Sequence, residues 1–435
     1  MIPANLSAFL ADDMEDDETT RTHTCYVTLK TDSVITAMDL SSNKVIYAIG
    51  EHGIKQIVNN QYIDKGNSEI VQEIMTGQMI QIGKGQFGTV FLVKTISGKY
   101  YALKKIHLKW DDEKDNYIWR EFHTIYTSES PHLVKLYECF YKETTVHLVM
   151  EYMDIGSLST IMNIIDLTRK TLKLLVRSES TKSLFPMGSE VKNVDRLSEQ
   201  ENERNKELIK KIVKTIRKLP QVFLQRYASG SCMSEKECAV IIKKVIEGLQ
   251  YLRSKHIIHR DIKPSNILMS KYGEVKISDF GLSNGKNLNI GNSGIYDTTY
   301  DTICGTRIYL SPERLREEKY GYNCDLWSTG LVLVELFTGK HPQDTTKDVV
   351  SCYTDFNLYV DNALKILREA FASNEMIDFV ACCLQIDRNK RPSYEQILQH
   401  PFLSSLSSMS NEEQNECLRN NLLSWIIPFI SQPEL

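Results

Sequence analysis

The sequence predicts an α+β protein in which strands and helices gather in two successive parts. Between about residues 72 and 151, short apolar segments alternate with glycine and polar turns, a pattern typical of antiparallel strands around one helix. From about residue 232 onward, apolar residues recur every three or four positions, which indicates helices. The polar, basic segment 166–231 separates these patterns and is predicted to be an insertion within the helical part.

The composition is typical of soluble globular proteins. The 435 residues are 42% hydrophobic and 25% charged, and this length suggests two or three domains. A net charge of -4 argues against a nucleic-acid partner, and no apolar stretch reaches the ~20 residues of a membrane span. The ten cysteines show neither paired metal spacing nor a disulfide framework, so we expect free thiols and a cytoplasmic protein.

Residues 1–71 are predicted to form an extension ahead of the main domain. The first part, to about residue 24, is acidic. The stretches "CYVTL", "SVITAMDL" and "KVIYAIG" follow, separated by polar turns, and they predict short strands between about residues 25 and 58. The sequence leaves open whether these strands pack against the next domain or form a small unit of their own.

A glycine-rich turn joins the first two strands of the next part. "MIQIGKG" and "GTVFLVKT" flank Gly85 and Gly88, and "KYYALKKIHL" gives a third strand. A glycine hairpin lets backbone amides approach phosphate groups, with Phe87 capping them and Val90 lying over a base. The same glycines also suit a plain hairpin, so this motif alone decides little.

A lysine on the third strand is the candidate phosphate-binding cation. Lys104 lies in "YALKK", and Glu121, in the helical stretch "DEKDNYIWREFHTIYTSES", is placed to orient it. The neighbouring Lys105 faces the opposite side of a strand, and the spacing from Ala102 favours Lys104. The alternative is an ordinary strand lysine that points into water.

The segment "HRDIKPSNIL" carries the most specific chemistry. Asp261 is placed to accept the proton of an attacking hydroxyl, and Lys263 to neutralise a moving phosphoryl group. Asn266 offers an oxygen to a hard cation such as Mg²⁺, and Arg260 is a ready partner for an added phosphate. In "ISDFGLS", Asp279 supplies a second metal ligand. Together these groups suit phosphoryl transfer, which depends on positioning and charge neutralisation.

With "GKGQFGTV", "YALK", "HRDIKPSN", "DFG" and "SPE" in that order, the sequence resembles a eukaryotic protein kinase over about residues 76–403, apart from the insertion. The resemblance implies a bilobal fold, with a small β-rich N-lobe that covers ATP and a larger α-helical C-lobe that holds the substrate. It also implies that Asp325 braces the catalytic loop and that Glu313 pairs with Arg391.

The same resemblance implies ATP and Mg²⁺ as cofactors. Asp261 and Lys263 act on the transferred group, Lys104 and Glu121 position the phosphates, and Mg²⁺ is held by Asn266 and Asp279. Met150 stands at the gatekeeper position, and the hinge backbone after it binds the adenine. The full set expected to bind ATP is Ile82, Gly83, Lys84, Gly85, Gln86, Phe87, Gly88, Val90, Ala102, Lys104, Met150, Glu151 and Met153.

The segment "GTRIYLSPERL" closely resembles the corresponding segment of the MAP kinase kinases. In that family two phosphorylatable hydroxyls lie four residues apart in the activation loop, and the matching positions here are Thr298 and Thr302. The resemblance implies an enzyme that is switched on at both threonines by an upstream MAP kinase kinase kinase. It would in turn phosphorylate a downstream MAP kinase on Ser/Thr and on Tyr.

Two alternatives stay open. The first is another Ser/Thr kinase of the same broad group, the STE group, acting elsewhere in a cascade. The second is a pseudokinase scaffold that binds partners without catalysis. Retention of Lys104, Asp261, Asn266 and Asp279 argues against the scaffold, because loss of such residues is its simplest signature.

Two segments depart from the family's pattern, and each has two interpretations. Within the insertion, "KKIVKTIRKLPQVFL" is either a basic peptide for an acidic docking groove on a MAP kinase or part of an amphipathic helix on the larger lobe. Leu208, Ile212 and Ile216 share one stripe of that helix. The tail 404–435 carries the apolar stretch "NLLSWIIPFI", which either engages an upstream activator or closes the core.

Overall fold

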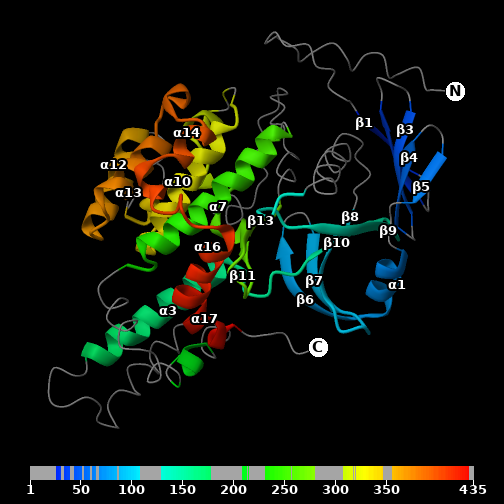
Figure 1. Ribbon diagram of the computed structural model, residues 1–435, viewed down its shortest axis with the longest axis horizontal. Helices are drawn as coiled ribbons and strands as arrows, with labels where there is room; N and C mark the ends of the chain where they lie inside the picture. The colour runs from blue at the N-terminus through cyan, green and yellow to red at the C-terminus, as the bar shows by residue number, and fades with distance from the viewer. Residues whose placement is uncertain are drawn as a thin grey trace, which may run out of the picture.

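A computed structural model of the chain shows two lobes and an additional sheet near the N-terminus (Figure 1). The structure describes residues 26–30, 34–39, 44–50, 53–58, 61–64, 68–85, 88–107, 129–177, 208–212, 214, 231–255, 257–279, 307–316, 318, 320–345 and 355–430.

The N-terminal sheet is a meander of five antiparallel strands that pair in chain order. Its strands are β1 (Tyr26–Lys30), β2 (Val34–Asp39), β3 (Lys44–Gly50), β4 (Gly53–Val58) and β5 (Gln61–Asp64). The short strands predicted between residues 25 and 58 are therefore present. They form a sheet of their own, and that sheet also contacts the next one, because β3 and β4 lie against its strand β9 (Leu136–Lys142).

The second sheet forms the smaller lobe, with strand order β6-β7-β8-β10-β9. Its other strands are β6 (Gln78–Gly85), β7 (Gly88–Lys94), β8 (Tyr100–His107) and β10 (Thr145–Glu151). Helix α1 (Ser68–Thr76) precedes the sheet, and its Val71 and Ile74 share a buried apolar cluster with Leu103 and Phe140. Period-two alternation along β8 and β10 thus gives the lobe its own core.

Helices build the larger lobe and pack around a central pair, α7 (Glu235–Ser254) and α10 (Asn323–Thr338). Helix α7 begins at a capping box made by Ser234 and Glu237, and α10 is buried along nearly its whole length. Among the described residues of this lobe, the other helices of eight residues or more are α3 (Leu158–Arg177), α12 (Phe356–Glu369), α13 (Asn374–Cys383) and α16 (Asn411–Leu418). The shorter ones include α9 (Pro312–Leu315), α14 (Tyr394–Leu398), α15 (Pro401–Ser404) and α17 (Ser424–Ile426).

A small sheet of β11 (Gly156–Ser157), β12 (Ile267–Met269) and β13 (Val275–Ile277) lies between the lobes in Figure 1. The predicted α+β, bilobal architecture is therefore confirmed: a β-rich lobe, then a larger helical lobe. No helix in the described part of the chain combines the length and apolarity that a bilayer crossing needs.

Helix α3 is longer than the sequence indicates. The predicted insertion starts at residue 166, whereas α3 continues without a break to Arg177. Thr168 and Thr171 are buried in it, and each donates its hydroxyl to the carbonyl one turn earlier at 2.7 Å. These polar residues are satisfied within the helix, which is why hydropathy alone places its end too early.

A short stretch of the predicted basic helix, residues 208–212, is described and helical. Ile209 and Ile212 are fully buried in the core of the larger lobe, while Lys210 is exposed. This arrangement fits the packed amphipathic helix rather than a free docking peptide. Ile216 and the apolar end of the proposed peptide lie outside the described residues.

The tail packs onto the larger lobe. Its apolar side chains that are no more than 2% exposed are Leu406, Leu418, Leu422, Leu423, Trp425, Ile426 and Phe429. Helix α16 lies against the turn between β12 and β13, where a Cβ on Gly273 would come within 2.2 Å of the Asn415 carbonyl oxygen. The structure therefore favours the core-closing interpretation of the tail, and Ile427 is the apolar residue of this stretch that stays markedly exposed.

A buried ion pair ties helix α9 to the end of the helical core, as the sequence predicts. Arg391 donates from Nη1 and Nη2 to the two carboxylate oxygens of Glu313, at 2.6 and 2.7 Å. Neither side chain is more than 3% exposed. Arg391 also donates to the carbonyl oxygens of Gln385 and Asn323, so all three guanidinium nitrogens donate hydrogen bonds.

We expect Arg391→Met to destabilise the protein by about 3–5 kcal/mol, because it leaves the Glu313 charge buried without a partner. The matched control is Arg253→Met, which removes the exposed Arg253–Glu395 pair and should cost less than about 1 kcal/mol. Urea unfolding of the two variants measures the difference. Equal losses in both would contradict a structural role for the buried pair.

A second buried polar group holds the segment that leads into α9. Tyr359 donates its hydroxyl to the Ile308 carbonyl at 3.0 Å and lies 3.4 Å from His341 Nε2. The other ring nitrogen of His341 accepts the Gln343 amide at 3.3 Å. The network assigns the proton of a neutral ring to Nε2. Burial lowers the pKa of His341 to about 4.

Acid should therefore weaken the fold through His341. Its pKa is about 4 in the folded protein and 6.5 in an exposed chain, so its contribution is complete above pH 6.5 and is lost as pH falls towards 4. At pH 5 the expected loss is about 2 kcal/mol relative to pH 7.5. His341→Gln removes this titration, and urea unfolding at the two pH values should show a smaller loss than in the unmodified protein. An unchanged pH dependence would rule out a buried neutral His341.

Candidate active site

The catalytic loop brings its three predicted groups together. Lys263 Nζ lies 2.7 Å from Asp261 Oδ2. The amide nitrogen of Asn266 donates to the backbone carbonyl of Asp261 at 2.8 Å and to its carboxylate at 2.9 Å. Asn266 thus spends its amide nitrogen on Asp261, which leaves its side-chain oxygen as the atom suited to a cation.

Asp325, near the start of α10, anchors the backbone of this loop through two hydrogen bonds. Its two carboxylate oxygens accept the amide hydrogens of His259 and Arg260, each at 2.8 Å. Arg260 has φ +71°, a left-handed conformation that is uncommon outside glycine and needs such support. Burial raises the pKa of Asp325, although the two amides favour its ionised form.

One β-hairpin carries both predicted metal ligands at the same end. Asn266 directly precedes β12, and Asp279 follows β13 by two residues. Ser278 closes this end, because its amide donates to the Asn266 carbonyl at 2.8 Å and its carbonyl lies 3.0 Å from His259 Nε2. His259 Nδ1 accepts the Asp261 amide, so Nε2 carries the proton and donates it to Ser278.

Lys104 and Asp279 meet across the gap between the lobes. Lys104 Nζ lies 2.7 Å from Asp279 Oδ1, and Asp279 has φ +58°. Partial removal from water would raise the pKa of Asp279, but the charge and hydrogen bond of Lys104 outweigh this and hold that pKa below the usual aspartate value. The predicted phosphate-binding lysine and the predicted metal ligand are therefore in one place.

The strand register supports the choice of Lys104 over its neighbour. Lys104 is buried, whereas Lys105 Nζ lies 4.7 Å over the ring of Phe91. Val90 on β7 is opposite Lys104, in agreement with a position above the nucleotide. A strand thus separates two adjacent lysines onto different faces, as period-two alternation requires.

The glycine turn is a hairpin between β6 and β7, with Gly85 opposite Gly88 and Gly83 opposite Val90. A Cβ on Gly88 would lie 2.1 Å from the Lys105 carbonyl oxygen, so only glycine fits against β8 there. Ile82 and Lys84, on the same strand β6, are exposed.

The hinge begins within β10: Met150 and Glu151 are the last two residues of this strand, and Met153 follows it. Met150 is half-buried and lies opposite Ala102 on β8, and a register shift in the pairing with β9 occurs beside it. Met153 is buried, two residues beyond Glu151. These positions agree with an adenine site bounded by Ala102 and Met150.

Five residues of the predicted site lie outside the described residues: Glu121, Gln86, Phe87, Thr298 and Thr302. The partner of Lys104 on the helix after β8, the tip of the glycine turn and both candidate phosphorylation sites therefore stay predictions.

The comparison with known proteins agrees with this arrangement. The protein kinase domain family matches residues 77–183 and 194–403. Mitogen-activated protein kinase kinase 2 of Arabidopsis thaliana is 31% identical over 328 residues, which cover 74% of this chain and 70% of the relative. The chain belongs to the MAP kinase kinase family of protein kinases.

Other members of this family match at similar levels. Mitogen-activated protein kinase kinase SIPKK of Nicotiana tabacum is 30% identical, over 74% of this kinase and 72% of the relative. The dual specificity mitogen-activated protein kinase kinase dSOR1 of Drosophila melanogaster is 28% identical, over 74% and 69%. The chain is therefore a protein kinase, and kinases of this fold use ATP with a divalent metal ion.

Sequence reasoning missed one partner of the hinge. It assigned Glu151 a backbone role, whereas its carboxylate forms an ion pair with Lys276 on β13. No motif drew attention to Lys276, because a lysine in a short strand is usually exposed. The contact depends on two segments that are 125 residues apart.

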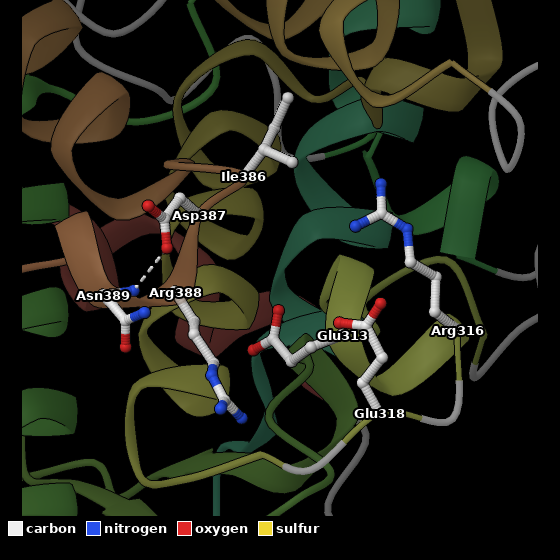
Figure 2. A pocket seen from close by; sticks show the side chains of 7 residues that line it. All are labelled: Glu313, Arg316, Glu318, Ile386, Asp387, Arg388 and Asn389. Carbon is white, nitrogen blue, oxygen red and sulfur yellow. Dashed lines mark hydrogen bonds between the residues drawn. The ribbon is translucent and has the colours of Figure 1, made fainter.

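A cavity of about 410 Å³ opens beside α9, and none of its lining residues belongs to the phosphoryl-transfer set (Figure 2). It is lined by Glu313, Arg316, Glu318, Ile386, Asp387, Arg388 and Asn389. Glu313 is paired with Arg391, Asp387 accepts the Asn389 amide, and Arg316 stacks over Phe356. These groups already have intramolecular partners, so the cavity does not indicate a ligand.

Asp378, Cys382 and His400 place a carboxylate, a thiol and an imidazole within 4.8 Å of one another. His400 Nδ1 accepts the Phe402 amide, so a neutral ring carries its proton on Nε2, which faces Asp378 at 3.1 Å. A metal needs a bare nitrogen at that position, and burial also raises the pKa of the Cys382 thiol. The cluster is therefore a hydrogen-bonded histidine and carboxylate beside a helix cap, not a metal site.

Asp325→Asn tests the support of the catalytic loop. An asparagine offers an oxygen to only one of the two amides and turns an NH2 group towards the other, so we expect kcat to fall on the order of 100-fold. Stability should fall by about 1–3 kcal/mol. The control is Asp387→Asn, whose oxygen caps a surface turn. Unchanged kcat in Asp325→Asn, measured with saturating ATP, would show that the loop does not need this anchor.

Proposed function

We propose that this kinase transfers the γ-phosphate of ATP to Ser/Thr and Tyr residues of a downstream MAP kinase. The observation that carries the proposal is the joint position of Asp261, Lys263, Asn266 and Asp279 at one end of the β12–β13 hairpin and its loop. The family relationship and the segment "GTRIYLSPERL" support the choice of substrate class.

The arrangement assigns a role to each group. The substrate hydroxyl oxygen forms a bond to the γ-phosphorus as the bond to the ADP oxygen breaks, and its proton passes to the Asp261 carboxylate. Lys263, 2.7 Å from Asp261, is near enough to neutralise the transferred group. Lys104 binds the phosphates from the opposite lobe.

The donor set fits Mg²⁺. The side-chain oxygen of Asn266 and the carboxylate of Asp279 are hard oxygen ligands, which Mg²⁺ prefers, and the cation supplies charge neutralisation between the phosphates when bound. Asn266 stays oriented because its nitrogen is bonded to Asp261. The Asp279 side chain is 44% exposed, so it is open to a ligand.

Activation by phosphorylation at Thr298 and Thr302 is part of the proposal. Arg260 is a suitable partner for a phosphate, because its guanidinium stacks over Tyr320 and its buried Nε has no hydrogen-bond partner within the described part of the chain. An upstream MAP kinase kinase kinase is the expected source of these phosphates. The cytoplasm is the expected compartment.

We expect Thr298→Glu/Thr302→Glu protein, given ATP and Mg²⁺, to phosphorylate a catalytically inactive MAP kinase on both Thr and Tyr of its activation loop. Mass spectrometry maps the product sites, and a generic basic protein serves as the second substrate. Asp261→Asn should lose at least about 100-fold in rate and still bind ATP.

Other outcomes point elsewhere. Labelling of the basic protein alone would favour a different kinase of the STE group. Labelling of neither substrate, together with ATP binding that Asp261→Asn leaves unchanged, would favour a scaffold over an enzyme.

A further inference from the structure

The carboxylate of Glu151 is fixed by contacts that its hinge position does not require. Its two oxygens lie 2.6 and 2.8 Å from Lys276 Nζ, and one of them also accepts the Lys135 amide at 3.2 Å. The Glu151 side chain is 19% exposed and that of Lys276 10%. A bidentate, largely desolvated pair with a further hydrogen bond has a defined geometry, unlike an exposed ion pair.

Each partner belongs to one end of the nucleotide site. Glu151 is the last residue of β10, where the adenine is expected. Lys276 is the middle residue of β13, and that strand leads through Ser278 directly to Asp279. The ion pair therefore joins the adenine end of the site to its metal end.

The backbone beside the pair strengthens the same connection. Glu151 donates its amide to the Lys135 carbonyl at 2.9 Å. One residue earlier, the Val134 amide donates to the Ile277 carbonyl at 3.0 Å, next to Lys276 in β13. The segment before β9 thus bonds to the hinge and to the hairpin at once, which leaves little freedom between them.

Glu151 is the principal partner of Lys276. The nearest other carboxylate, Glu274, is 3.8 Å from Lys276 Nζ and accepts a hydrogen bond from the Ser270 hydroxyl at 2.8 Å. Within the described residues, the charge of Lys276 is therefore directed at the hinge.

We propose that Glu151 and Lys276 are positioning residues that couple the adenine and metal ends of the nucleotide site. This inference rests on the proposed function, since it assumes adenine at the hinge and Mg²⁺ at Asn266 and Asp279. The pair sets the span between the two ends, so that nucleotide bound at the hinge presents its phosphates where the metal is held. Loss of the pair should weaken the effect of Mg²⁺ on nucleotide affinity more than affinity itself.

The matched control is a neighbouring ion pair that does not reach β13. Lys271 lies 3.3 Å from Asp154 and its side chain is 50% exposed. Asp154 also accepts the Lys271 amide at 2.7 Å, and this bond survives any change of the side chain. Lys271→Met thus removes a charge pair from the same hairpin without touching the hinge contact.

The test compares ADP affinity with Mg²⁺ and with EDTA, by calorimetry on the full chain. Glu151→Met/Lys276→Met replaces both charges, which avoids leaving one of them buried alone. We expect the ratio of the two dissociation constants to fall on the order of tenfold in this variant, within the usual range of coupling between sites. Affinity in EDTA should fall by a smaller factor than affinity with Mg²⁺, and Lys271→Met should keep the ratio of the unmodified protein.

Two results would overturn the inference: an unchanged ratio in the double variant, or an equal loss of affinity with and without Mg²⁺, which indicates a general structural role. Thermal unfolding of each variant in the absence of ligand separates misfolding from uncoupling, and Glu151→Gln/Lys276→Met provides a second uncharged pair if the first variant does not fold. Absence of Mg²⁺-dependent ADP binding in the unmodified protein would instead count against the proposed function itself.

Discussion

The active site depends on a carboxylate that touches no reacting atom. Asp325 lies in α10, which is buried along nearly its whole length, and it accepts two consecutive amides of the catalytic loop. One of those amides belongs to Arg260, a left-handed residue whose conformation the loop would not keep unaided. Because α10 is enclosed by other helices, one side chain connects the rigid core to the loop that holds Asp261, the proposed base. The packing of the helical lobe therefore determines where the catalytic loop lies.

Local chemistry was predictable from the sequence wherever a motif concentrates it. The separation of Lys104 from Lys105 onto different faces of β8 and the pairing of Glu313 with Arg391 are present in the structure, because strand alternation specifies the first and a resemblance to a known family the second. The carboxylate of Glu151 was not predictable as an ion-pair partner. Its contact with Lys276 joins segments that are distant in the sequence, and no local sequence pattern around either residue indicates that they pair.

The end of helix α3 was placed too early for a different reason. The second half of α3 contains Thr168 and Thr171, whose hydroxyls donate hydrogen bonds to carbonyls of the same helix. Polar residues therefore occupy buried positions there. The tail shows the converse: an apolar stretch suits a partner's surface as well as the protein's own core. The sequence pattern indicates that these apolar residues need burial, but only the tertiary structure shows which surface covers them.

The close contact between Gly273 and Asn415 links the tail to the hairpin that holds Asn266 and Asp279. A side chain at position 273 and a docked tail exclude each other, so the packing of α16 requires glycine at this position. A shortened chain, or a fusion that lifts α16, would uncover the hairpin turn and free it to move.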